Sequence, residues 1–92
     1  MITVIRATAS WCQPCKALAP LLKKVEEQYA GRVNFKVVDV EEDKDTAEKY
    51  VIRSVPTVLF LDSQGESSGR LVGVKPLQDY IDAIEVRLKA DV

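Results

Sequence analysis

The chain has 92 residues, of which 47% are hydrophobic, and this is enough for one domain with its own core. Thirteen basic and 14 acidic residues give a net charge of −1, which argues against a nucleic-acid-binding surface. Segment 1–11 lacks the basic and apolar regions of a secretory signal, and no apolar run approaches the roughly 20 residues that span a membrane. We therefore expect one cytoplasmic domain over residues 1–92.

The first half of the chain predicts a strand, a helix and a second strand. Residues 2–8 form a short β-branched run that is typical of a strand. A helix is expected from Cys12 to about Ala30, ended by Gly31, because apolar residues recur there at helical spacing: Leu18, Leu22, Val25 and Tyr29, with Leu21 beside them. Residues 33–40 are nearly continuous in apolar side chains, which predicts a buried parallel strand.

The second half predicts a short helix, a hairpin and a last helix. The short helix covers residues 43–52, and the strands 57–62 and 69–73 flank a turn at 63–66. Pro76 opens the last helix, whose apolar face contains Leu77, Tyr80, Ile81, Ile84 and Leu88. The order βαβαββα predicts an α/β fold with a four-stranded mixed sheet flanked by helices.

Cys12 and Cys15 are the only two cysteines, and their spacing suits a metal site, a structural disulfide or a redox pair. A small secreted domain held together by disulfides usually has four or more cysteines, and this pair closes a very short loop. One Cys-x-x-Cys supplies two of four zinc ligands and the chain has no histidine, so zinc would need a site shared across a dimer. We therefore favour redox chemistry and expect no bound metal.

The predicted position of the pair gives the two sulfurs different roles. The first strand leads directly to Cys12, at the sheet edge where sites form in such folds. At a helix start, residues i and i+3 lie about 5–6 Å apart at Cβ, within reach of a disulfide. Free N–H groups and the helix dipole favour an anion at the first sulfur. Cys12 is therefore predicted to attack and Cys15 to resolve.

Three flanking residues fit this interpretation. Pro14 lies in the first helical turn, where its missing N–H has no cost and its fixed φ stiffens the loop. Trp11 is expected to be exposed beside Cys12. Lys16 either adds positive potential near the sulfurs or is simply solvated.

Residues along nearly the whole chain resemble the thioredoxin family. The resemblance rests on Trp11-Cys12-Gln13-Pro14-Cys15-Lys16 and Ala19-Pro20, and then on "KY" at 49–50, "IRSVPT" at 52–57, Gly65-Glu66 and Val72-Gly73. It implies a thioredoxin fold in which a cis peptide bond before Pro56 faces the cysteines. It also implies that Trp11 and the backbone around Val55, Pro56, Thr57 and Gly73 line a groove where a client pairs like an added strand. Trp11, Gln13, Pro14, Lys16 and Pro56 would support the site.

The implied activity is the reduction of protein disulfides by dithiol–disulfide exchange through Cys12 and Cys15. No bound cofactor is expected, because electrons would come from an NADPH-dependent flavoprotein thioredoxin reductase. The partners would be that reductase and disulfide-containing clients, and we expect a monomer. Two alternatives stay open: a glutathione-coupled, glutaredoxin-like reductase, and a thioredoxin-fold binding subunit with incidental cysteines.

The chain departs from the family pattern in two places. It starts without the strand and helix that usually precede the first strand. Arg6 stands where the family has a buried acid, and Val37 stands where it has a basic partner, with Lys36 adjacent. Arg6 is expected either to reach solvent past an uncovered face or to place its charge near the sulfurs, where it would favour thiolate.

Overall fold

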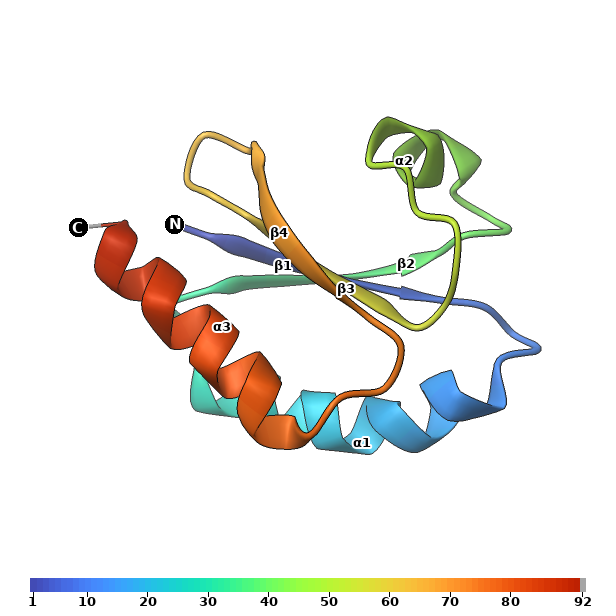
Figure 1. Cartoon of the computed structure of the whole chain (residues 1–92), viewed down its shortest axis with the longest axis horizontal. Helices are drawn as coiled ribbons and strands as arrows, with labels where there is room; N and C mark the ends of the chain where they lie inside the picture. Colours follow the sequence, from blue (N-terminus) through green and yellow to red (C-terminus); the bar gives the residue numbers. More distant parts are fainter. Residues whose placement is uncertain (92) are drawn as a thin grey trace.

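The computed structural model describes residues 1–91, and its elements follow the predicted order βαβαββα (Figure 1). The strands are β1 (Thr3–Thr8), β2 (Asn34–Asp39), β3 (Thr57–Leu61) and β4 (Ser67–Val72). The helices are α1 (Gln13–Gln28), α2 (Lys44–Lys49) and α3 (Leu77–Ala90). Within residues 1–91, no helix combines the length and the apolar composition that crossing a membrane requires.

The four strands form one mixed sheet in the order β2-β1-β3-β4. β1 and β2 are parallel, whereas β3 is antiparallel to β1 and to β4, so the predicted hairpin is confirmed. Ala7 near the end of β1 pairs with Thr57 at the start of β3, and Thr57 pairs with Val72 at the end of β4. The segments that follow β1, precede β3 and follow β4 therefore meet at one edge of the sheet.

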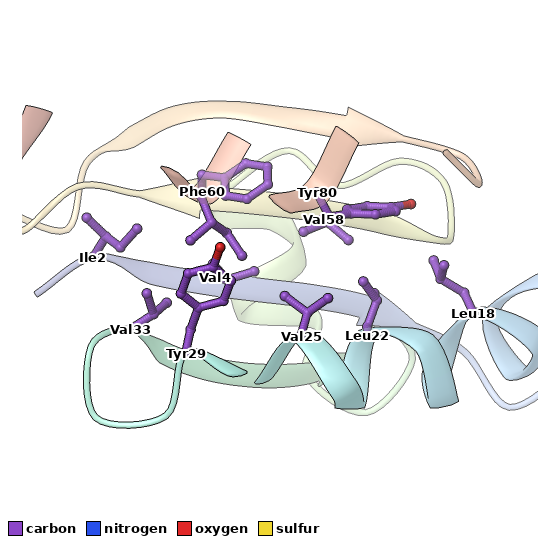
Figure 2. Packing of buried hydrophobic residues seen from close by; sticks show 11 residues of the cluster. Ile2, Val4, Leu18, Leu22, Val25, Tyr29, Val33, Val58, Phe60 and Tyr80 are labelled. Atoms are coloured by element: carbon purple, nitrogen blue, oxygen red, sulfur yellow. The ribbon is translucent and has the colours of Figure 1, made fainter. Parts of the chain in front are cut away.

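The helices cover the two faces of the sheet unequally. In Figure 1, α1 and α3 lie on one face and α2 lies on the other. The larger core fills the space between the sheet and the pair α1 and α3, and burying one large apolar side chain there contributes about 1.5–3 kcal/mol. Its members are shown in Figure 2: Ile2, Val4, Leu18, Leu22, Val25, Tyr29, Val33, Val58, Phe60, Tyr80 and Ile84.

The predicted helix faces are largely confirmed by this core. Every α1 residue predicted on the apolar stripe is buried, except that Leu21 is exposed. In α3, Tyr80 and Ile84 are buried, and three neighbours pack against the same cluster: Leu77, Ile81 and Leu88. The strands alternate as expected, because a second cluster of Ile5, Val38, Leu59 and Leu61 lies on the opposite face with Tyr50 against it.

Two expectations about secondary structure are wrong. Segment 33–40 was expected to be a buried strand, but β2 is an edge strand that pairs only with β1, and Val37 is 52% exposed. The helix expected over 43–52 ends at Lys49, because Val51 has a left-handed backbone with φ 53° and cannot continue it.

Candidate active site

The two cysteines lie at the start of α1 and are joined by a disulfide bond with a Cα–Cα distance of 5.3 Å. Cys12 is the N-cap residue, and its Sγ accepts a hydrogen bond from the backbone N–H of Cys15 at 3.2 Å. Pro14 occupies the first turn, as predicted, where no helical N–H is needed. The Cys15 N–H therefore points at the Cys12 sulfur, and together with the positive end of the helix dipole it favours the anionic form of that sulfur.

Both cysteine side chains are almost completely covered in this disulfide form, each being 3% exposed. They form a small cluster with Ala9, and Val40 and Val55 pack against it. Within residues 1–91, no group of three or more His, Cys, Asp or Glu side chains could hold a metal ion. The surroundings of the sulfurs are thus apolar, apart from backbone N–H groups.

The segment before β3 faces the cysteines across this cluster. The Val55–Pro56 peptide bond is cis, and Pro56 is buried. The backbone N–H of Gly73 donates to the Pro56 carbonyl at 2.9 Å. Gly73 has φ 83°, a conformation that glycine adopts without a steric cost. The three segments expected to meet at this sheet edge are therefore brought together.

Tyr80 is a site-supporting residue that sequence reasoning missed, because its periodicity indicated only a core position. Its ring is 1% exposed, and its hydroxyl donates to the Gly73 carbonyl at 3.3 Å. The same hydroxyl accepts from the backbone N–H of Lys75 at 3.1 Å. α3 is thereby attached to the segment that follows β4.

The surface around the cysteines is apolar on one side. Trp11 is 64% exposed, as expected, and Val72 and Val74 are also exposed. Gln13, Pro14 and Lys16 are exposed on the first turns of α1. Thr57, which was predicted in the substrate groove, has a buried side chain that donates to the Ser54 carbonyl at 2.8 Å. Its side chain therefore holds the turn before Pro56, and the expected contribution of the Thr57 backbone to the groove stays a prediction.

Arg6 lies away from the cysteine cluster. It is partly buried on the α1 side of β1, paired with Val37 of the edge strand. Its neighbours around an open hollow are Lys16, Ala19, Pro20, Lys23 and Glu26. Arg6 was expected either to reach solvent or to place its charge near the sulfurs; its side chain is only partly exposed with a buried Nε, and it is not part of the cysteine cluster. The Asp39 Oδ1 accepts from the backbone N–H groups of Glu41 and Glu42.

The known proteins to which this chain is similar include thioredoxins of bacteria and a thioredoxin-like protein of a plant. A family model described as thioredoxin matches residues 1–86. Thioredoxin C-2 of Corynebacterium nephridii is 46% identical over 77 residues, which cover 80% of this chain and 70% of that protein. The chloroplastic thioredoxin-like protein HCF164 of rice is 37% identical over 84 residues, which cover 89% of this chain but only 32% of that protein.

A solved structure agrees with these relatives. A mutant thioredoxin from Halobacterium salinarum NRC-1 superimposes with a TM-score of 0.85 at 29% identity, covering 95% of this chain and 74% of that one. The sheet order, the Cys12–Cys15 pair at a helix start and the family match point to the same conclusion. The chain belongs to the thioredoxin family, whose members are protein disulfide oxidoreductases.

Proposed function

We propose that this protein reduces the disulfides of client proteins, with Cys12 as the attacking sulfur and Cys15 as the resolving one. The observation that supports these roles is the hydrogen bond from the Cys15 N–H to the Cys12 Sγ at the N-terminus of α1. Donors and a positive dipole end stabilise an anion there, and the thiolate is the nucleophile in thiol–disulfide exchange. Cys15 lies one turn inside the helix, at a Cα distance of 5.3 Å that a disulfide bridges without backbone movement.

The reaction proceeds through a mixed disulfide. The Cys12 thiolate attacks one sulfur of the client disulfide, forms a Cys12–client bond and releases the other client sulfur as a thiolate. Cys15 then loses its proton, attacks the Cys12 sulfur and releases the second client thiolate. Two electrons pass to the client, and its two thiolates take up the two protons that the protein thiols gave up. The product is the Cys12–Cys15 disulfide.

The client docks on the apolar surface beside the cysteines. Trp11 provides an exposed aromatic face, and Val55 packs against the covered cysteines. Pro56 and Thr57 hold the segment around Val55 in shape, because the Pro56 carbonyl accepts from Gly73 and the Thr57 hydroxyl donates to Ser54. An extended client segment can add to this edge through main-chain hydrogen bonds.

An NADPH-dependent flavoprotein thioredoxin reductase returns two electrons to the Cys12–Cys15 disulfide. The protein itself holds no cofactor, and it acts as a single-domain monomer in the cytoplasm. The proposal is tested by insulin reduction with NADPH and a thioredoxin reductase, compared with reduced glutathione as the only electron source. Turnover with the first system supports it, whereas turnover with glutathione alone indicates a glutaredoxin-like reductase.

The cysteine requirement separates an enzyme from a binding subunit. A Cys12→Ser/Cys15→Ser double variant is expected to lose all insulin reduction while keeping its fold, since both side chains remain small. Circular dichroism checks the fold. Retention of a biological function by this variant would indicate a binding subunit with incidental cysteines.

A further inference from the structure

A basic trough runs along one flank of α1, and its lining begins at Lys16, the residue that follows Cys15. It is an open hollow of about 700 Å³ lined by Arg6, Lys16, Ala19, Pro20, Lys23 and Glu26. Arg6 comes from β1 and the other five residues come from successive turns of α1. No residue of α3 lines it.

The cationic side chains of the basic trough have no carboxylate partner among residues 1–91. Within residues 1–91, no carboxylate lies within 4.0 Å of a side-chain nitrogen of Arg6, Lys16 or Lys23. The Nε of Arg6 is buried and has no hydrogen-bond acceptor. A buried donor without an acceptor is destabilising, and more so when the group is charged.

The local charge contrasts with that of the whole chain. Three cations and one anion, Glu26, line the trough, whereas the chain as a whole has 13 basic and 14 acidic residues. The N-terminal end of α1, near Lys16, adds the positive end of a helix dipole. The ligand chemistry that fits is a carboxylate.

The position of the trough relative to the cysteines indicates that the carboxylate belongs to the client. Pro56 and Gly73, beside which the client docks, belong to the β3 and β4 side of the sheet, whereas Arg6 pairs with the edge strand β2. Lys16, at one end of the trough, follows Cys15 in the chain, so a client bound to Cys12 can extend over the trough. The trough is wide and shallow rather than enclosed, which suits a side chain of a bound protein segment.

We propose that the basic trough recognises an acidic side chain of the client, so that disulfides flanked by Asp or Glu are reduced faster than others. This inference rests on the proposed function, and it names the class of client. Lys16 and Lys23 lie about 6 and 16 Å from Cys12 along the helix axis. An extended segment rises about 3.3 Å per residue, so the acidic residue lies about two to five positions from the client cysteine.

The test compares two peptides that each contain one intramolecular disulfide and differ only in Glu or Gln at those positions. Reduced protein is mixed with excess oxidised peptide, and the second-order rate constant is followed by the fluorescence of Trp11. The rate constants of both peptides with dithiothreitol correct for their intrinsic reactivity. The corrected Glu-to-Gln ratio then measures recognition by the protein alone.

We expect a ratio of about three to ten in dilute buffer, the range of one or two partly screened charge contacts. The ratio should approach one in about 1 M salt, where the Debye length is about 3 Å. Lys23→Glu should lower the ratio to about one or below. Glu26→Gln should raise it, because it removes the competing carboxylate from the trough.

Lys89→Glu, at an exposed position of α3, is the matched control, since it changes the net charge by the same amount. A ratio of one in the unmodified protein overturns the inference, and so does an equal fall in the Lys89→Glu and Lys23→Glu variants, which would indicate long-range charge alone. Failure of the protein to reduce either peptide would instead contradict the proposed function.

Discussion

Replacing Tyr80 with Phe removes a single hydroxyl that joins α3 to the client surface. That hydroxyl donates to the Gly73 carbonyl at 3.3 Å and accepts from the Lys75 N–H at 3.1 Å. Gly73 in turn donates to the Pro56 carbonyl, so the loss is transmitted to the segment facing the cysteines. The ring itself stays in the core, and packing is unchanged.

The expected cost follows from these two bonds. A typical net hydrogen bond contributes about 0.5–1.5 kcal/mol, and a partly buried donor left without an acceptor costs about 1–3 kcal/mol. Tyr80→Phe should therefore destabilise the protein by about 2 kcal/mol. For a domain of this size, each kcal/mol lowers Tm by about 4–8 °C.

Tyr29→Phe is the matched control. Tyr29 is also 1% exposed, and its hydroxyl donates to Glu85 Oε1 at 2.6 Å, away from the client surface. Both variants should be less stable in urea and thermal unfolding. Only Tyr80→Phe should also lower kcat/KM for insulin reduction, measured well below its Tm. An unchanged kcat/KM, or an equal loss in both variants, would refute the positioning role of Tyr80.

Three further predictions concern the rest of the fold. Val51→Gly should raise the free energy of unfolding by about 1 kcal/mol, because glycine relieves the left-handed backbone at φ 53°. Val51→Ala should raise it by less. A lower free energy of unfolding for Val51→Gly in urea would contradict this. Burial and the hydrogen bond to Glu85 raise the pKa of Tyr29 above 10.0. The contribution of Tyr29 to the free energy of unfolding is therefore complete below that pH and declines as pH rises through the folded pKa. The free energy of unfolding of Tyr29→Phe, measured against pH, should lack this decline. The side-chain and backbone hydrogen bonds of Thr46 lower the pKa of Asp43 below 3.8, so the cap of α2 is present above that pH and is lost as pH falls through the folded pKa. Hydrogen exchange of the Thr46 amide should therefore lose protection at low pH. The Asp43→Ala variant, which has no cap at any pH, should not show this change.

Much of the fold could be predicted because local patterns and packing agree. The 3.6-residue spacing of Leu18, Leu22 and Val25 corresponds to one buried face of α1. The sequence could not show which strand lies at the edge of the sheet, because an apolar run is compatible with an edge strand and with a central strand. Strand order depends on long-range pairing, and the edge strand β2 contains both an exposed Val37 and a buried Val38.

The candidate site likewise has features that the sequence predicts and features that it does not. The spacing of Cys12 and Cys15 at a helix start identified the pair, since that chemistry is local. The role of the Tyr80 hydroxyl was not visible, because it depends on where the segment after β4 passes over α3. The open flank beside Arg6 likewise depends on which side of α1 the other helices cover.

The proposed roles of the two sulfurs are tested most directly by trapping the mixed disulfide. Reduced Cys12→Ser and Cys15→Ser variants are mixed with oxidised insulin, quenched with acid and analysed by mass spectrometry. The account predicts a stable insulin adduct on Cys12 in the Cys15→Ser variant and almost none in the Cys12→Ser variant, because only Cys12 has its anion stabilised at the start of α1. An adduct that forms faster on Cys15 than on Cys12 would contradict it.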